Sequence, residues 1–382
     1  MIPYGRQSIS QEDIEAVTSV LKSDFLTQGP QVPLFESKIA QLTQSKYAVA
    51  GNSATSMLHA ACLALGVSES DTVWTSPISF VASANCALYC GASVDFIDID
   101  PDTANISPKA LQLKLAEASQ VDKLPKVIIA VHMAGHSSDM EQISRLARKY
   151  NIKVIEDAAH GVGGSYLNSP LGSCKYSDIT IFSFHPVKII TTGEGGVATT
   201  NDPNLAKSMS LCCSHGITKN KVDMQSSEEG DWFYEQQSLG FNYRMTDLQA
   251  GLGNSQLTQL ASIVEKRNLL ATRYQSLLLG NGIKVITPLK DSVSSYHLLL
   301  VVLPEHCDRR AIFNSMRSAD IGVHVHYIPI HLQPFYHKLG FRKGDFPNAE
   351  RYYQSCLTLP LFPDLTFEQQ DYVCNTLKEL LS

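Results

Sequence analysis

The chain has 382 residues, a net charge of −6 and 44% hydrophobic residues, which is typical of a soluble globular protein large enough for two domains. Only 18% of the residues are charged and no polybasic block occurs, so neither nucleic acid nor a membrane surface is expected as a partner. The N-terminus has no apolar signal segment, and no apolar run approaches the roughly 20 residues of a membrane span. We therefore expect a cytoplasmic protein.

Cysteine and histidine spacings give no sign of a metal site. The nine cysteines are odd in number, scattered and without a Cys-x-x-Cys pair, which predicts mostly reduced, buried thiols. The twelve histidines lack the spacings of zinc sites. The pairs His324/His326 and His132/His136 could ligate a metal, but their spacing is a weak signal, and we predict that no metal is bound.

Strand-like and helical patterns alternate between residues 46 and 200. Apolar runs at 72–76, 93–99, 126–135 and 152–158 are separated by amphipathic segments near 80–89, 108–118 and 139–150. This alternation predicts an α/β fold with a mostly parallel sheet covered by helices on both faces. Ligands of such sheets bind beyond the carboxyl ends of the strands.

The C-terminal third has a different pattern. Residues 245–279 predict a long helix or a helix pair, and residues 283–382 mix strands (295–303, 321–328) with helices (near 309–317 and 367–381). An exposed loop is expected at 225–233. We therefore expect a large domain over residues 1–245, followed over residues 246–382 by a connecting helix and a smaller α+β domain.

Two residues of opposite charge follow predicted strands of the large domain. Asp157 closes the run 152–158, and Lys188 follows the apolar run 179–182. Asp157 alone would also suit a helix N-cap or a surface ion pair. A lysine beyond a buried strand, however, must form an ion pair, contact water or take part in the chemistry of the site. Because strand ends meet at one edge of the sheet, we expect Asp157 and Lys188 to face the same crevice.

Small polar residues supply a candidate phosphate site. The stretch GNSATS (51–56) opens a predicted helix, whose free N–H groups and dipole favour an anion, although Ser53 would serve equally as an ordinary N-cap. Ser183 adds a hydroxyl, and Phe80 could stack on a flat ring or belong to the core. A lysine, a carboxylate and a phosphate site together suit pyridoxal phosphate, which needs an amine for covalent attachment and an anion near its pyridine nitrogen.

These motifs occur in one order along nearly the whole chain: GNSATS, TSPISF, VHMAGHSSDM, EDAAH, SFHPVK with TTGEGG, LGFNYRMTDLQAG and HVHYIPIHLQPFY. In this combination the chain resembles the DegT/DnrJ/EryC1/StrS family of sugar aminotransferases, which have the aspartate-aminotransferase-like fold (fold type I of the pyridoxal phosphate enzymes). The stretches PYGRQSI, FLTQGP, TSPISF and SFHPVKIITTGEGG are most similar to members that aminate C4 of a UDP-4-keto-6-deoxy-N-acetylhexosamine in pseudaminic acid synthesis, with L-glutamate as donor.

The resemblance implies roles for individual residues. Lys188 would carry the cofactor covalently and act as the catalytic base, and Asp157 would pair with the pyridinium nitrogen. His160 would contact the ring hydroxyl, although many family members have glutamine at this position. Ala54, Thr55 and Ser183 would hold the phosphate, Phe80 would stack on the ring, and Asn242 would reach the neighbouring subunit's phosphate in a homodimer. The nucleotide-sugar pocket would be lined by Tyr4, Leu26, Thr27, His326 and Tyr327.

Three other interpretations were weighed. A dehydrase of the same fold resembles this chain but carries histidine where Lys188 stands, so the lysine disfavours it. A non-catalytic relative would have been free to lose Lys188 and Asp157, and both are present. An aminotransferase for another keto nucleotide sugar, either D-configured 4-keto or 3-keto, stays open because specificity rests on pocket shape and a few hydrogen bonds.

Overall fold

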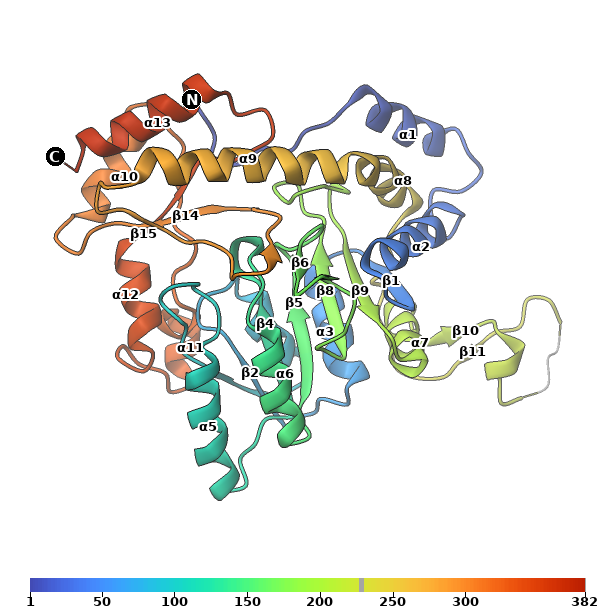
Figure 1. The fold of residues 1–382 in the computed structure, drawn as a ribbon. Helices are drawn as coiled ribbons and strands as arrows, with labels where there is room; N and C mark the ends of the chain where they lie inside the picture. The colour runs from blue at the N-terminus through green and yellow to red at the C-terminus, as the bar shows by residue number, and fades with distance from the viewer. Residues whose placement is uncertain (227–229, 382) are drawn as a thin grey trace.

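The computed structural model describes residues 1–226 and 230–381, and its centre is a seven-stranded sheet in the order β1-β9-β8-β5-β4-β2-β3 (Figure 1). Strands β3, β2, β4, β5 and β8 are parallel, and β9 runs antiparallel to both of its neighbours. The predicted mostly parallel α/β sheet is therefore confirmed. The strands are β1 Tyr47–Gly51, β2 Thr72–Thr75, β3 Ser93–Phe96, β4 Val127–Val131, β5 Lys153–Asp157, β8 Ile179–Ser183 and β9 Gly196–Thr200.

Helices bury both faces of this sheet. Ile129 and Ile155 pack with α3 (Ala54–Ala64), α4 (Ala82–Tyr89) and α7 (Pro203–Cys213), while Ile128 and Val154 pack with the helices of the opposite face. Successive strand residues point to opposite faces, so burial on both sides requires the continuous apolar runs seen in the sequence. The opposite face is covered by α2 Gln31–Thr43, α5 Pro108–Gln120, α6 Met140–Lys149 and α8 Asp247–Gln256.

The C-terminal part forms a second, smaller sheet with its own apolar core. Strands β12 (Lys284–Val285), β14 (Leu299–Val302) and β15 (Cys356–Leu359) are antiparallel and pack with α10 (Arg309–Ser318) and α13 (Phe367–Glu379). The helix pair predicted at 245–279 is confirmed: α8 is followed by η3 (Leu257–Gln259) and by α9 (Leu260–Leu278), which runs from the large sheet to the small one (Figure 1). Because α8 packs against α1 (Gln11–Leu21) and α2, the domain limit at residue 245 stays a prediction.

The remaining elements are short. A hairpin of β10 (Ile217–Thr218) and β11 (Glu235–Gln236) projects from the large sheet (Figure 1). The exposed loop predicted at 225–233 includes residues 227–229, which lie outside the described residues. The other elements are β6 Ser165–Tyr166, β7 Ser169–Pro170, β13 Ser292–Val293, η1 Met133–Gly135, η2 Lys221–Asp223, η4 Ile330–Leu332, α11 Pro334–Lys338 and α12 Pro347–Ser355.

The strand predicted at 321–328 is wrong, and the one at 295–303 is shorter than predicted. The first segment makes only single-residue bridges, Ile321 to Ile2 and His324 to Thr358, because two different partners share its backbone hydrogen bonds. In the second, Tyr296 has a left-handed φ of 47°, which is incompatible with a strand, and β14 begins only at Leu299. Both irregular segments reach the cavity described below.

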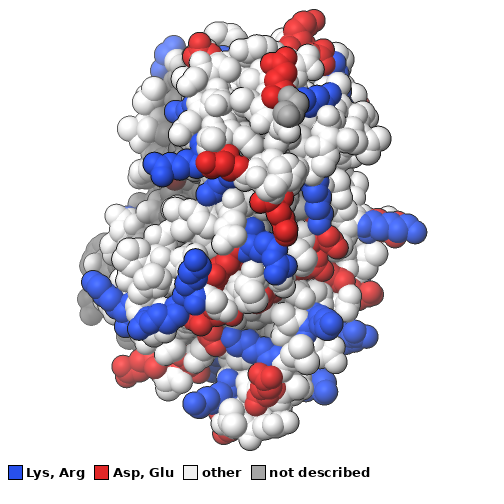
Figure 2. Space-filling view, turned by 90° about the vertical axis from the view of Figure 1, so that its left-hand side faces the viewer, with Lys and Arg blue, Asp and Glu red and all other residues white. Residues whose placement is uncertain are grey.

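Within the described part of the chain, all nine cysteines are free thiols and no helix is both long and apolar enough to cross a membrane. On the face shown in Figure 2, lysine and arginine side chains are interspersed with aspartate and glutamate. This mixing accords with the small net charge of the sequence.

Candidate active site

A cavity of about 780 Å³ opens beyond the carboxyl ends of β5 and β8 and is closed on one side by the C-terminal part of the chain. Its volume lies within the usual range for small-molecule sites. Most of the predicted site residues line this one cavity: Tyr4, Ala54, Thr55, Phe80, Asp157, His160, Ser183, Lys188, His326 and Tyr327.

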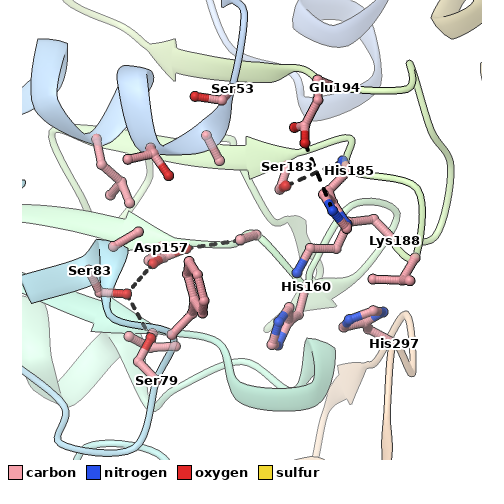
Figure 3. Close-up of a pocket in the computed structure, with 18 of the residues that line it drawn as sticks. Ser53, Ser79, Ser83, Asp157, His160, Ser183, His185, Lys188, Glu194 and His297 are labelled. Atoms are coloured by element: carbon pink, nitrogen blue, oxygen red, sulfur yellow. Dashed lines mark hydrogen bonds and ion pairs between the residues drawn. The ribbon is translucent and has the colours of Figure 1, made fainter. Parts of the chain in front are cut away.

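Asp157 is the last residue of β5, and both of its carboxylate oxygens are held (Figure 3). Oδ2 accepts a hydrogen bond from Ser83 Oγ at 2.5 Å, and Oδ1 accepts one from the Ala159 amide at 3.1 Å. Ser83 in turn lies 2.6 Å from Ser79 Oγ. Asp157 is only 5% exposed, and none of the ion pairs found among the described residues includes it. The carboxylate is thus fixed by neutral donors and leaves its charge available to a cation.

Lys188 lies in the loop between β8 and β9 rather than at the strand end itself. The loop is closed by hydrogen bonds from the Lys188 amide to His185 O and from the Thr192 amide to Phe184 O. Burial lowers the pKa of Lys188 to about 8, while the negative charge of Asp157 acts in the opposite direction. A far larger fraction of this amine is therefore neutral, and nucleophilic, near neutral pH than for an ordinary lysine.

The N-terminus of α3 forms the anion-binding end of the cavity. Ser53 is the N-cap and accepts from the Ser56 amide, so the capping role left open by the sequence is real. Ala54 and Thr55 occupy the next two positions, where helix amides have no partner within the helix, and among the described residues none is found for them. At the start of β9, a side chain on Gly196 would overlap the backbone of Ser53 and Ala54. Absence of that side chain lets β9 approach the helix end.

His160 follows Asp157 on the loop after β5 and is nearly buried. The Ala134 amide lies 3.3 Å from Nδ1, and Nε2 lies 3.3 Å from the hydroxyl of Tyr327. Burial, together with the nearby charge of Lys188, lowers the pKa of His160 well below its usual range. The ring is therefore neutral, Nδ1 is the acceptor, and Nε2 carries the proton.

Phe80 is not a core residue, which was the alternative left open by the sequence. Its side chain is 59% exposed and lines the cavity, with its ring 6.5 Å from that of Tyr327. An exposed aromatic ring at a cavity wall is available for stacking on a planar ligand.

The irregular segment after Ile321 brings the rings of His326 and Tyr327 to the cavity. His326 Nδ1 lies 2.8 Å from the Thr358 hydroxyl, and burial lowers the pKa of His326 to about 3. The His326 ring lies 5.6 Å from that of Tyr4, which arrives from the N-terminal segment. The N-terminal and C-terminal parts of the chain thus form one wall together.

Leu26, Thr27 and Asn242 lie outside the cavity lining. Thr27 bridges Thr246, and the Leu26 carbonyl accepts from the Asp247 amide at 3.0 Å, which places both beside the start of α8. Asn242 is exposed. Its carbonyl lies 3.4 Å from the side-chain amide of Asn52, a residue that does line the cavity. The roles predicted for these three residues stay predictions.

The sequence interpretation missed several lining residues. Ser83 is on the first turn of α4, three residues after Phe80, and the spacing gave no hint that it would reach Asp157. His297 lay within the run interpreted as a strand. His185 and Glu194 flank Lys188 in the loop, with their side chains 3.9 Å apart. Proximity to Lys188 was the signal that could have drawn attention to this last pair.

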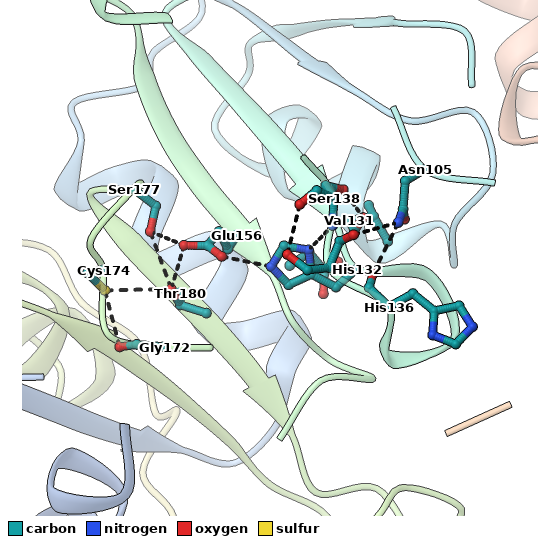
Figure 4. Close-up of polar contacts among 12 residues, drawn as sticks. Asn105, Val131, His132, His136, Ser138, Glu156, Gly172, Cys174, Ser177 and Thr180 are labelled. Carbon is teal, nitrogen blue, oxygen red and sulfur yellow. Dashed lines mark hydrogen bonds and ion pairs between the residues drawn. The ribbon is translucent and has the colours of Figure 1, made fainter. Parts of the chain in front are cut away.

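Glu156, the neighbour of Asp157, belongs to a buried polar network behind the cavity (Figure 4). Its Oε2 lies 2.7 Å from His132 Nε2, and its Oε1 accepts from the hydroxyl of Ser177 at 2.5 Å. The Ser138 amide donates to His132 Nδ1, so His132 Nε2 carries the proton donated to Glu156. This network ties β4 and the VHMAGHSSDM motif to the end of β5 that carries Asp157.

Comparison with known proteins identifies the family. The profile of the DegT/DnrJ/EryC1/StrS aminotransferase family matches residues 7–378. The chain belongs to this family. It is 39% identical to a UDP-4-amino-4,6-dideoxy-N-acetyl-beta-L-altrosamine transaminase of Campylobacter jejuni, over 100% of this chain and 98% of the relative.

Solved structures of family members have the same fold. The sugar aminotransferase Spr1654 of Streptococcus pneumoniae, in its PMP form, superimposes with a TM-score of 0.92 at 30% identity, covering 100% of this chain and 99% of that one. Helicobacter pylori PseC, an aminotransferase of pseudaminic acid biosynthesis, gives 0.89 at 31% identity with the same coverage. The chain is therefore a pyridoxal phosphate-dependent nucleotide-sugar aminotransferase with the family's α/β fold.

The cavity residues suit this cofactor. Asp157 is a buried carboxylate without an ion-pair partner among the described residues, which fits a protonated pyridine nitrogen. The amine of Lys188 has a lowered pKa, and the first-turn amides of α3 lie in the same lining. A covalent anchor, a counter-ion and an anion site are thus found together in one cavity.

Proposed function

We propose that this sugar aminotransferase moves the amino group of L-glutamate to C4 of a UDP-4-keto-6-deoxy-N-acetylhexosamine, giving UDP-4-amino-4,6-dideoxy-N-acetyl-β-L-altrosamine for pseudaminic acid synthesis. The observation that carries the chemistry is the placement of Lys188 and Asp157 in one cavity with the N-terminus of α3. The sugar assignment is supported by the full-length similarity to relatives with this named activity.

The similarity to the family supplies the individual roles, and the geometry of the cavity supports them. Lys188 would anchor the cofactor through its amine, and Asp157, held by Ser83 and Ala159, would pair with the pyridine nitrogen. The amides of Ala54 and Thr55, with the Ser183 hydroxyl, would bind the phosphate. His160 would donate its Nε2–H to the ring hydroxyl, and Phe80 would stack on the ring.

Proton transfer is the task of Lys188 in both half-reactions. Bound pyridoxal phosphate would supply the electron sink for removal of the α-proton of glutamate. The Lys188 amine, which is neutral at pH values above its pKa of about 8, would accept that proton. In the second half-reaction the same amine returns a proton to C4 of the sugar. The hydrogen bonds from the Ser83 hydroxyl and the Ala159 amide would hold the Asp157 carboxylate in place in both half-reactions.

The sugar is held between the N-terminal and C-terminal segments of the chain. Tyr4, His326 and Tyr327 line the same cavity as Lys188, and we assign them to binding of the acceptor sugar. The pKa of His326 lies well below neutral pH, so this ring offers neutral hydrogen bonding rather than charge. Leu26 and Thr27 are assigned to the nucleotide-sugar pocket through the similarity alone.

The homodimer is part of this proposal. Asn242 is exposed, and its backbone contacts Asn52 at the edge of the cavity. Placed against a second copy of the chain, this residue would reach the partner's phosphate site. The active unit would then have two sites, each completed by an asparagine from the other subunit.

The test separates the chemistry from the sugar. The purified protein, loaded with pyridoxal phosphate, is converted with L-glutamate, and loss of the visible absorption band is recorded. The L-configured and the D-configured UDP-4-keto-6-deoxy-N-acetylhexosamines are then added in separate samples. Rapid return of the band with only the L-configured sugar is expected. Return with only the D-configured sugar would contradict the pseudaminic acid assignment, and failure to form any band would contradict the proposed roles of the site residues.

A further inference from the structure

The ring of His297 lies against His160, at a centroid distance of 4.4 Å and an interplanar angle of 46° (Figure 3). His297 stands just before β14, is 5% exposed and lines the cavity. Its Nδ1 is buried and has no hydrogen-bond partner among the described residues. Because this nitrogen makes no hydrogen bond, the His297 ring acts on its neighbours here through packing.

The backbone before His297 is bonded directly to the loops that carry the site. Ser295 Oγ donates to the carbonyl of His160 at 2.7 Å, and Ser294 Oγ donates to the carbonyl of Gly135 at 2.9 Å. Gly135 has a φ of +90°, and a Cβ there would lie 2.7 Å from the His160 carbonyl. Tyr296 adopts a left-handed φ of 47°, which non-glycine residues seldom do. The segment thus adopts an unusual backbone shape while packed closely on the His160 loop.

A buried arginine holds the same segment from the other side. Arg267 on α9 is 1% exposed, and its Nη1 donates to the carbonyls of Tyr296 at 3.0 Å and Leu361 at 3.1 Å, with His297 O at 3.4 Å. Among the described residues no ion pair involves Arg267 and its buried Nε has no partner, so the hydrogen bonds that it makes run from Nη1 to backbone carbonyls. The position of His297 is therefore fixed at both ends of the segment.

We propose that His297 is a positioning residue, whose ring packing fixes the imidazole of His160 and so directs Nε2 of His160 toward the cofactor ring. The Ala134 amide fixes one edge of the His160 imidazole through Nδ1, and His297 supports the ring itself. The proposal rests on the role given to His160 above. It assigns to the segment 294–297 a function in the active site beyond that of a connection to the small sheet.

The surroundings keep both imidazoles uncharged. Burial and the charge of Lys188 lower the pKa of His160, and burial with the charges of Lys188 and Arg267 lowers the pKa of His297. Removing the His297 ring would expose the His160 imidazole to water and reduce the burial that lowers its pKa. The titratable groups that face His160 are Lys188, His136, His297, His326 and Tyr327.

The first measurement needs no cofactor. Full-length, cofactor-free protein with ¹⁵N-labelled histidine is titrated by NMR, with His160 assigned through His160→Gln. In the wild type, His160 is expected to stay neutral, protonated on Nε2, through the neutral range. In His297→Ala, we expect its pKa to rise toward the ordinary value and both tautomers to appear. His297→Phe, which keeps a ring, should behave as the wild type, and His306→Ala, at an exposed site, is the control.

The second measurement uses the enzyme loaded with pyridoxal phosphate. His297→Ala should slow the glutamate half-reaction at least tenfold and shift the pH midpoint of the visible band, with KM for glutamate changed less than threefold. His297→Phe should restore both. The proposal is overturned if His297→Ala leaves the His160 tautomer and titration unchanged, or if His297→Phe disturbs them as much as alanine does. Absence of a visible band in the wild type would instead refute the proposed function, while the cofactor-free titration still decides the role of His297.

Discussion

Ser83 Oγ lies 2.5 Å from Asp157 Oδ2, and this hydrogen bond joins the first turn of α4 to the end of β5. It fixes the carboxylate that faces the cavity, and Ser79 orients the Ser83 hydroxyl in turn. The orientation of the Asp157 side chain therefore depends on α4 as well as on β5, the strand that carries it.

Ser83→Ala should weaken catalysis by removing one of the two donors to Asp157. A hydrogen bond to a charged group contributes about 1.5–3 kcal/mol, so the glutamate half-reaction should slow by about 10- to 100-fold. Stopped-flow decay of the visible band measures this rate. Ser83→Thr, which keeps the hydroxyl, is the matched control and should retain most of the rate. A rate for Ser83→Ala within twofold of the wild type would show that Ser83 does not orient Asp157.

The pKa of Lys188 predicts how cofactor attachment depends on pH. Only the neutral amine attacks the aldehyde, so with a pKa of about 8 the attachment rate should rise about tenfold per pH unit below pH 8 and level off above it. An ordinary lysine would show a rise continuing to about pH 10. The profile is measured by adding pyridoxal phosphate to cofactor-free protein at a series of pH values and recording the rate at which the visible absorption band grows.

Two variants check the cause of this profile. Lys188→Ala should form no covalent attachment, and a band identical to that of the wild type would remove Lys188 from the site. The charge of Asp157 raises the pKa of Lys188, so Asp157→Asn should move the midpoint of the profile to lower pH.

The sequence located the centre of this site because strand ends of a parallel sheet meet at one edge. Asp157 and Lys188 could be placed there from the pattern of apolar runs alone. Ser83 and His297 could not, because their contacts depend on how a helix and a distant segment pack on the sheet. The strand predicted at 321–328 is wrong for the same reason. The alternation of apolar and polar residues there suits a strand, but the backbone hydrogen bonds of this segment go to two different partners. The apolar pattern determines the layers, and tertiary packing determines the loops that line the cavity.

Gly196→Ala should damage the phosphate end of the cavity. The added Cβ would overlap the backbone of Ser53 and Ala54, so β9 and the start of α3 must separate. We expect a loss of about 1–3 kcal/mol in unfolding free energy and at least tenfold weaker binding of pyridoxal phosphate, measured by urea unfolding and equilibrium dialysis. Gly5→Ala, where nothing lies within 4 Å of the new Cβ, is the control. Unchanged cofactor affinity in Gly196→Ala would contradict the assigned phosphate site.

Glu156→Gln should mainly reduce stability. It replaces the buried carboxylate that accepts hydrogen bonds from His132 and Ser177, and loss of a hydrogen bond to a charged group costs about 1.5–3 kcal/mol. Denaturant unfolding of the full-length protein gives the value. Glu265→Gln, at an exposed position on α9, should change it by less than about 0.5 kcal/mol. If Glu156→Gln lowers the free energy of unfolding no more than Glu265→Gln does, the network of Figure 4 adds nothing to the stability of the protein.

Asn242 offers a test of the shared site by subunit mixing. Lys188→Ala alone should be inactive, and Asn242→Ala alone should bind cofactor weakly at limiting concentration. In a mixed dimer, the subunit with intact Lys188 would receive an intact asparagine from its partner, which restores one complete site. Refolding the two variants together in equal amounts should thus restore about a quarter of all sites, measured as activity at limiting cofactor. Activity no greater than the average of the separate variants would show that Asn242 acts within its own subunit or not at all.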